Sequence, residues 1–197
     1  MARLQRTFFE RPAAEVARGL LGKRLVRKTG PGIISGRIVE TEAYIGEDDL
    51  ASHARFGKTA RNRIMYGRGG FVYIYLIYGI YYNLNIVAAT EGVPEAVLIR
   101  SLEPVAGQKL AKANLEKFGR VRANRDLMKG PGKLCVALGL DKSFYGEDLI
   151  SSKRIWVEDA GETPQIDAST RIGIDYAGHY RDKPWRFTVR GSKYVSK

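Results

Sequence analysis

The chain has 197 residues, long enough to bury a hydrophobic core within a single domain. Its 33 lysines and arginines against 21 aspartates and glutamates give a formal net charge of +12, which favours a polyanionic partner but leaves an enzyme and a binding module equally open. The single cysteine, Cys135, excludes an intrachain disulfide framework. The sequence has only two histidines, and it lacks the ligand spacings of zinc fingers and zinc deaminases.

The N-terminal residues contain no apolar stretch typical of a targeting segment, and no apolar run in the sequence approaches membrane length. We therefore expect a soluble, cytoplasmic protein. Residues 10–22 then predict a short helix, with Pro12 in its first turn and Gly22 at its end. Residues 23–28 and 33–39 predict two strands joined by a glycine-rich turn.

Residues 37–44 (RIVETEAY) predict an extended strand that carries unusual polar residues. Period-two alternation places Ile38, Glu40, Glu42 and Tyr44 on one face. Two carboxylates beside an aromatic ring are not typical of a core strand, so this face is a candidate for chemistry. Residues 45–53 then predict a turn that enters a short helix, with acids in its first turn.

Residues 55–68 contain five basic residues and no acid, and glycines interrupt any regular element. We interpret this segment as a loop that contacts phosphates, with Arg61 and Arg63 as candidates. The alternative is an ordinary solvated loop.

Residues 71–79 and 80–87 are two aromatic, β-rich runs on either side of Gly79. A glycine between such runs predicts a hairpin, with Tyr78 near its tip and Tyr73 and Tyr75 on a common face.

The C-terminal half predicts a buried strand at residues 95–102, a helix at 103–119 that begins at Pro104, and a second basic patch at 120–133. Residues 130–139 predict a short helix that begins with a glycine-rich segment. The first backbone N–H groups of this helix could hold a phosphate, and the alternative is an ordinary helix start. Further strands are predicted at 155–157, 170–174 and 185–190. Closely spaced strands with few crossover helices favour a single α+β domain, residues 1–197, on an antiparallel sheet.

Several of these motifs, in this order, resemble the alkyladenine (3-methyladenine) DNA glycosylase family. They are residues 37–44, 52–53, 61–63, 73–79, 84–86, 98–104 and 130–135, and the resemblance extends from Phe8 to Ser192. It implies a curved, open-barrel-like antiparallel sheet with peripheral helices and a protruding β-hairpin. It also implies a monomer that needs no cofactor or metal and is associated with the nucleoid. Its substrate would be double-stranded DNA containing damaged purines: 3-methyladenine, 7-methylguanine, hypoxanthine or ethenoadenine. The enzyme would flip the nucleotide out, hydrolyse the N-glycosidic bond and leave an abasic site.

The resemblance also implies roles for individual residues. Glu42 is expected to activate water as the general base, with Arg100 and a backbone carbonyl from residues 171–174 holding that water. Tyr44, His53 and Tyr75 are expected to wall the base pocket, and Asn85 to crowd the 2-amino group of normal guanine. Tyr78 is expected to fill the gap in the duplex, and further DNA contacts are expected from Arg61, Arg63, Met65 and Lys133.

The sequence also allows two other functions. The first is a metal-dependent nuclease with Glu40, Glu42, Asp48 and Asp49 as ligands. The second is a non-catalytic nucleic-acid-binding module in which the tyrosines stack bases. Lyase chemistry is not expected, because the segments around Glu42 and Tyr75 contain no lysine that could act as a nucleophile.

Overall fold

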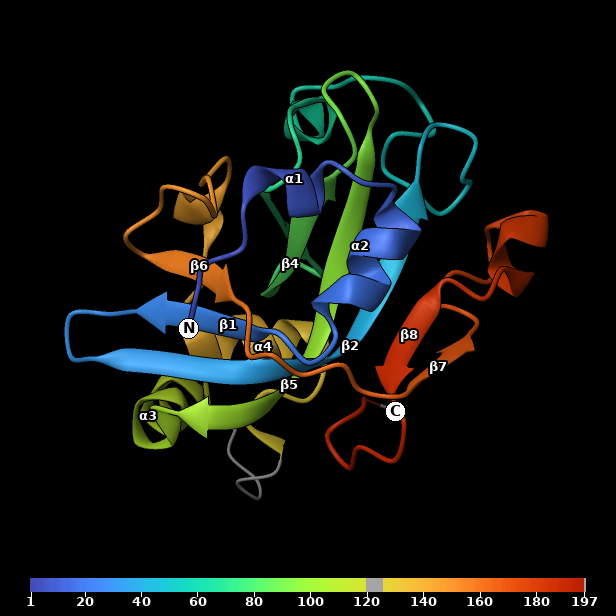
Figure 1. The fold of residues 1–197 in the computed structure, drawn as a ribbon. Helices are drawn as coiled ribbons and strands as arrows, with labels where there is room; N and C mark the ends of the chain where they lie inside the picture. The colour runs from blue at the N-terminus through green and yellow to red at the C-terminus, as the bar shows by residue number, and fades with distance from the viewer. Residues whose placement is uncertain (120–125, 197) are drawn as a thin grey trace.

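The computed structural model describes residues 1–119 and 126–196. Its strands form one antiparallel sheet that curls into a half-barrel (Figure 1). The strands are β1 (Arg24–Lys28), β2 (Ile33–Ile45), β3 (Val72–Ile77), β4 (Tyr81–Ala88), β5 (Glu95–Ala106), β6 (Ile155–Glu158), β7 (Ile166–Ser169) and β8 (Arg186–Val189). Their order is β3-β4-β5-β2-β1-β6, and β8 pairs with both β2 and β7. The predicted α+β class and curved antiparallel sheet are confirmed.

Four α-helices accompany the sheet within the described part of the chain: α1 (Arg6–Phe9), α2 (Ala13–Leu20), α3 (Gln108–Lys117) and α4 (Pro131–Leu138). Helix α2 buries Ala13, Val16, Ala17 and Leu20, the spacing that lines one face of a helix. It lies against β2 (Figure 1), and the Thr41 hydroxyl donates to the Ala17 carbonyl at 2.9 Å. Helices α2 and α4 contribute to the same hydrophobic core.

Alternate residues of the strands pack into the hydrophobic core, and the residues between them point to the opposite face of the sheet. On β4, Leu84 and Ile86 enter the core, whereas Asn83 and Asn85 line a cavity. On β5, Ile99 enters the core, whereas its neighbours on either side line the same cavity. The sheet therefore separates a hydrophobic core from a face that carries polar side chains and the cavity.

Two β-bulges shift the pairing of β2 with β5 at the centre of the sheet. Ile38 pairs with Leu102 and Glu40 with Ser101, so Val39 is an extra residue on β2. Thr41 then pairs with Ile99, which makes Arg100 an extra residue on β5. Bulges of this kind change the direction of a side chain and are common beside active sites.

The first bulge corrects one expectation about the β2 faces. Ile38 packs in the main core, as does Ala43. Glu40 and Glu42 instead contact Arg100 on the polar face. Strict alternation had placed Ile38 with the two glutamates, and the extra residue at Val39 reverses the side on which Ile38 lies.

The helix predicted at 103–119 begins later than expected. Residues 103–106 extend β5, where Pro104 pairs with Gly36, and α3 begins only after Gly107. Gly107 has a φ of 72°, and a Cβ there would lie 2.2 Å from the Ile33 carbonyl oxygen. The chain therefore makes its turn at Gly107, where only glycine fits, and not at Pro104.

Two further predicted elements are turns or loops in the structure. Ile45 ends β2, and residues 46–53 form turns and no helix, because Asp49 accepts hydrogen bonds from the backbone N–H groups of Ile45 and Ala51. Residues 170–174 follow β7 as a loop and not a strand, with a φ of 75° at Gly173. Of the predicted second basic patch, Arg120, Arg122 and Arg125 lie outside the described residues.

Strands β3 and β4 pair from Val72 to Ile77 and are joined by a short turn. The Ile80 N–H donates to the Ile77 carbonyl at 3.2 Å. Tyr78 and Gly79 have φ values of 53° and 67°, as a type I′ turn requires. Among the helices that the structure describes, none is long and apolar enough to cross a membrane.

Candidate active site

A cavity of about 370 Å³ opens on the polar face of the sheet. Strands β2, β3, β4 and β5, the loops before β3 and after β7, and the start of α4 all contribute to its wall. The wall includes these residues singled out from the sequence: Tyr44, His53, Arg61, Met65, Tyr75, Tyr78, Asn85 and Arg100. Residues far apart in the chain are thus brought together around one space.

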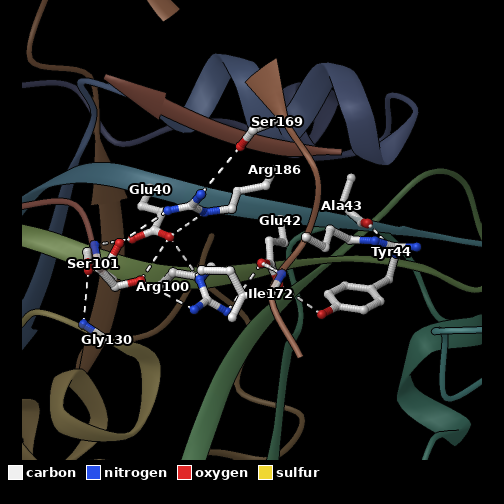
Figure 2. Close-up of polar contacts among 12 residues, drawn as sticks. Glu40, Glu42, Ala43, Tyr44, Arg100, Ser101, Gly130, Ser169, Ile172 and Arg186 are labelled. Carbon is white, nitrogen blue, oxygen red and sulfur yellow. Dashed lines mark hydrogen bonds and ion pairs between the residues drawn. The ribbon is translucent and has the colours of Figure 1, made fainter. Parts of the chain in front are cut away.

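Glu42 lies directly behind this wall, with a side chain that is 0 % exposed. Its Oε1 accepts a hydrogen bond from the Ile172 N–H at 2.8 Å and lies 3.2 Å from Nη1 of Arg100. Its Oε2 accepts from the Tyr44 hydroxyl at 2.9 Å. Figure 2 shows these partners converging on the carboxylate from three sides. Because Tyr44, Arg100 and Ile172 all line the cavity, Glu42 is one layer from it.

Burial raises the pKa of Glu42, although Arg100 and the Ile172 N–H act in the opposite direction. A carboxylate with a raised pKa is a stronger base than an ordinary glutamate. Burial and the neighbouring Glu42 also raise the pKa of Tyr44, so its hydroxyl remains protonated and donates to the carboxylate. Glu42 therefore has the environment expected of a group that exchanges a proton.

Glu40 has a different environment on the same strand. Its Oε1 accepts from Nε of Arg100 at 2.9 Å and from Nε of Arg186 at 2.8 Å. The backbone N–H of Ser196 donates to its Oε2 at 2.7 Å. Burial alone would raise the pKa of Glu40, but Arg100, Ser196 and Arg186 together lower it. The salt bridge predicted for Glu40 is confirmed.

Aromatic rings form the next part of the wall. The ring centroids of His53 and Tyr75 are 4.5 Å apart, and those of Tyr73 and Tyr75 are 5.2 Å apart. Nδ1 of His53 lies 2.6 Å from the Tyr73 hydroxyl. Burial, with Arg61 and Arg55 nearby, lowers the pKa of His53 to about 4. The imidazole is therefore neutral near pH 7 and does not repel a cation in the cavity.

Asn85 lies beside these rings on β4, opposite Leu98 of β5. Its Nδ2 donates to the Tyr73 carbonyl at 3.3 Å, and the side chain is buried at the cavity wall. The amide is therefore held in one place and reduces the space available to a ligand there.

The five predicted DNA contacts occupy different positions. Tyr78 is 84 % exposed at the cavity rim, and Arg61 is exposed with its guanidinium 5.1 Å from the Tyr75 ring centroid. Arg63 is exposed at the start of a 3₁₀ turn, outside the cavity wall. Met65 is only 1 % exposed, so it can contact a ligand inside the cavity but not the outside of a duplex. Lys133, in the first turn of α4, lines a second cavity of about 250 Å³.

One ion pair that contributes to the site was not expected from the sequence. Nη1 and Nη2 of Arg171 lie 2.6 Å and 2.8 Å from the two carboxylate oxygens of Asp49. The same guanidinium lies between the rings of Tyr44 and Trp185, 4.8 Å and 5.0 Å from their centroids. Arg171 directly precedes Ile172, so this pair fixes the backbone N–H that contacts Glu42. Asp49 and Arg171 are 122 residues apart, and no local pattern relates them.

Three of the four acids proposed as nuclease ligands are bound by arginines. Glu40 and Glu42 contact Arg100, Asp49 is bound by Arg171, and Asp48 is exposed. Residues 1–119 and 126–196 contain no group of three or more His, Cys, Asp or Glu side chains arranged to hold a metal ion. The arrangement of these four acids therefore favours ion pairing with arginine over a shared ligand set.

Comparison with known proteins gives a consistent result. Residues 7–193 match the family described as "Methylpurine-DNA glycosylase (MPG)". A protein of Methanocella arvoryzae named "Putative 3-methyladenine DNA glycosylase" is 48% identical over 194 residues, which cover 98% of this chain and 96% of that protein. A protein of Mus musculus named "DNA-3-methyladenine glycosylase" is 43% identical over 205 residues, which cover 98% of this chain and 61% of that protein.

Proposed function

Because this chain belongs to the methylpurine-DNA glycosylase family, we propose that it removes damaged purines from double-stranded DNA by hydrolysing the N-glycosidic bond. The lesions would be 3-methyladenine, 7-methylguanine, hypoxanthine and ethenoadenine. The enzyme would act as a monomer without a cofactor, associated with the nucleoid, and the product would be an intact abasic site.

The observation that carries this proposal is the position of Glu42 behind a cavity walled by tyrosines. The cavity volume, about 370 Å³, lies within the range of small-ligand pockets, roughly 300–1,000 Å³. A non-catalytic binding module would need the stacking rings but not a buried carboxylate with a raised pKa beside them. The pairing of that carboxylate with the cavity therefore favours an enzyme.

In the chemical step, the C1′–N bond of the nucleotide breaks and a water oxygen bonds to C1′. The departing purine keeps the electron pair of the broken bond, so a purine made cationic by alkylation leaves as a neutral base. A neutral purine such as hypoxanthine or ethenoadenine leaves as an anion and takes up a proton from solvent, which balances the proton that water loses. Glu42 takes the proton that water loses, and its negative charge stabilises the oxocarbenium-like sugar. Oε2 of Glu42 accepts one hydrogen bond from Tyr44, and a carboxylate oxygen can accept a second, which water would donate.

Arg100 and Ile172 would hold Glu42 in place during this step. The Arg100 charge favours the ionised carboxylate that a base must be, whereas burial maintains its basicity. The Ile172 N–H fixes the orientation of Oε1 from the opposite side. The two partners thus set both the charge and the direction of the carboxylate.

The aromatic wall would select the base after it leaves the helix. Extruding a nucleotide costs roughly a few kcal/mol, least for a damaged pair. Tyr44 and Tyr75 can stack on the planar purine and attract it more strongly when it is cationic. Neutral His53 adds no opposing charge. Tyr78, which is exposed at the rim, would replace the lost stacking in the duplex.

The basic residues near the rim would hold the phosphate backbone. Arg61 and Arg63 are exposed on the loop before β3, and Lys133 lies in the first turn of α4. Neutralising phosphates releases counterions, so binding should weaken steeply with salt. Met65 would contact the extruded nucleotide from inside the cavity.

We also propose that the enzyme is monofunctional. Among the described residues that line the cavity there is no lysine, the usual nucleophile of a lyase-type glycosylase. Water would then be the only nucleophile, and the DNA strand would remain unbroken.

The test uses duplexes that each carry one of the four lesions, incubated with the protein in the presence of a chelator, with chromatography of the released base. We expect free damaged base and an unbroken strand that alkali cleaves at the abasic site. Loss of activity in chelator would support the metal-dependent nuclease. Binding without release from any of the four would support the binding module, and strand breakage without alkali would contradict the monofunctional mechanism.

A further inference from the structure

The end of the chain reaches the residues that hold Glu42. Ser196 is 8 % exposed and lies beside Glu40, although the two are 156 positions apart in the sequence. Its backbone N–H donates to Oε2 of Glu40 at 2.7 Å, and its hydroxyl donates to Oε1 at 2.9 Å. A serine near the chain end therefore satisfies both oxygens of a buried carboxylate.

The Ser196 hydroxyl also contacts the arginine of the site. Nη2 of Arg100 donates to this hydroxyl at 3.3 Å while the hydroxyl donates to Glu40. A hydroxyl can accept and donate at once, so Ser196 links the two charged groups. Neither link involves Glu42 directly.

Arg186 holds the backbone of the same residue. Its Nη2 donates to the Ser196 carbonyl at 3.2 Å, and its Nε donates to Glu40 at 2.8 Å. Figure 2 shows Arg186 above Glu40, with a further contact to Ser169. Ser196 is thus fixed through its N–H, its carbonyl and its hydroxyl.

These contacts determine where the Arg100 guanidinium points. Glu40 binds its Nε at 2.9 Å and Ser196 binds its Nη2, and the remaining Nη1 lies 3.2 Å from Glu42. A planar guanidinium held at two of its nitrogens has a fixed direction for the third. Arg100 is also the extra residue of a β-bulge, so the strand pairing alone does not set that direction.

We propose that Ser196 is a positioning residue for base release: its hydroxyl, with Glu40, holds Arg100 in the orientation that presents Nη1 to Glu42. The inference rests on the proposed glycosylase function, because it assigns Ser196 a role in that reaction. Ser196 itself would not touch DNA, since it lies behind Arg100 and outside the cavity wall.

A merely structural role makes a different prediction. If Ser196 only anchored the end of the chain, its substitution would lower the melting temperature and leave the rate of folded protein unchanged. If it positions Arg100, the rate would fall at temperatures where the protein is fully folded. The pH dependence of release would change as well, because it follows the pKa of Glu42. Burial and Glu40 raise that pKa, whereas Arg100 and the hydrogen bond from Tyr44 lower it.

The variants are Ser196→Ala, which removes the hydroxyl, and Ser196→Thr, which retains it. Ser192→Ala is the matched control, because it removes a hydroxyl from the same end of the chain. The only described contact of the Ser192 hydroxyl is the hydrogen bond that it accepts from the Tyr194 N–H at 3.3 Å. Single-turnover release of hypoxanthine from a duplex and the dissociation constant for that duplex are measured across pH, below each variant's unfolding transition.

We expect Ser196→Ala to slow release at least about tenfold, as small misplacements of catalytic groups do, with the dissociation constant changed less than twofold. The acid limb of its pH profile should move to higher pH, because a looser Arg100 lowers the pKa of Glu42 less. Ser196→Thr should recover most of the rate, and Ser192→Ala should match the natural protein. If Ser196→Ala is unfolded at the assay temperature, Ser196→Cys, with similar size and a weaker hydrogen bond, is judged by the same criteria.

Equal rates and equal pH midpoints for Ser196→Ala and Ser192→Ala, with the natural protein active, would overturn the inference and leave the glycosylase function standing. If the natural protein and Ser192→Ala release no base from any lesion duplex, the proposed function is wrong and the positioning role is wrong with it.

Discussion

Glu40 and Glu42 bind the same guanidinium, yet the protein shifts the pKa of the two carboxyls in opposite directions. Arg100 lies 2.9 Å from Glu40 through Nε and 3.2 Å from Glu42 through Nη1. Donors from Arg186 and Ser196 also reach Glu40 and lower its pKa, whereas burial dominates at Glu42 and raises its pKa. One carboxyl thus remains an anion that holds the structure, and the other is suited to take up a proton.

This contrast predicts opposite effects on stability near pH 7. Glu42 has a raised pKa, so the folded protein pays for its ionisation at neutral pH, and Glu42→Gln should increase the free energy of unfolding. Glu40 has a lowered pKa and contributes stability above its ordinary value of 4.5 that is lost as the pH falls. Glu40→Gln should therefore destabilise the protein, by about 3–5 kcal/mol if a buried charge pair is broken.

Urea unfolding of both variants from pH 3 to pH 8 measures these effects. The gain from Glu42→Gln should shrink as the pH falls through the raised pKa of Glu42, where the natural carboxyl is also neutral. A loss of stability in both variants at pH 7 would show that Glu42 is another structural anion.

The pH dependence of base release follows from the same shift. A general base works only when ionised, so release should fall as the pH drops through the pKa of Glu42, which burial has raised above 4.5. The acid limb of the single-turnover rate on a 7-methylguanine duplex should therefore have its midpoint above that value. His53 should not contribute to a limb near neutrality, because its pKa is lowered to about 4. A rate that stays constant down to pH 4 would exclude Glu42 as the base.

The backbone conformation of Tyr78 predicts that one substitution changes stability and DNA binding in opposite directions. Tyr78 has a φ of 53°, a conformation that costs an L-residue roughly 1–2 kcal/mol relative to glycine. Tyr78→Gly should therefore stabilise the protein by up to about 1 kcal/mol while it weakens binding to lesion duplex, because the ring that replaces lost stacking is gone.

The binding part is measured against a single strand carrying the same lesion, which needs no wedge. Tyr78→Phe is the control, since it retains the ring. Equal losses of affinity for duplex and single strand in Tyr78→Gly would show that Tyr78 does not act as a wedge.

The buried amide of Asn85 predicts a specificity change. Asn85 is held against the cavity wall by its bond to the Tyr73 carbonyl, and serine is shorter. Asn85→Ser should make room for the 2-amino group of guanine. The rate of normal guanine release should rise severalfold, as expected if the activation free energy falls by about 1 kcal/mol. Release of hypoxanthine, which lacks that group, should change less. An unchanged ratio of guanine to hypoxanthine release would remove the filtering role.

Local sequence patterns predicted the parts of the site that lie on regular strands. Alternation in residues 37–44 placed Glu40, Glu42 and Tyr44 together, and the structure confirms that their side chains share one polar network. The glycine after Tyr78 predicted the turn between β3 and β4, because positive φ favours glycine. These features depend on near neighbours in the chain, which a pattern can express.

The remaining parts depend on contacts between distant residues. The bulges at Val39 and Arg100 arise from the pairing of two strands and leave no local sign in either one. Ser196 and Arg171 contact acids more than one hundred residues away, so their positions required the folded chain. The predicted helix start at Pro104 was wrong for a similar reason, because the pairing of Pro104 with Gly36 extends β5 through that proline.

A comparison of the natural protein with Glu42→Gln shows whether Glu42 activates water for base release. The natural protein and Glu42→Gln are mixed in excess with a duplex carrying hypoxanthine, and both binding and single-turnover release are measured. We expect Glu42→Gln to bind the duplex as tightly as the natural protein and to release the base at least about 100-fold more slowly, the smallest effect expected for a lost general base. Release by Glu42→Gln at the natural rate would show that Glu42 is not the general base.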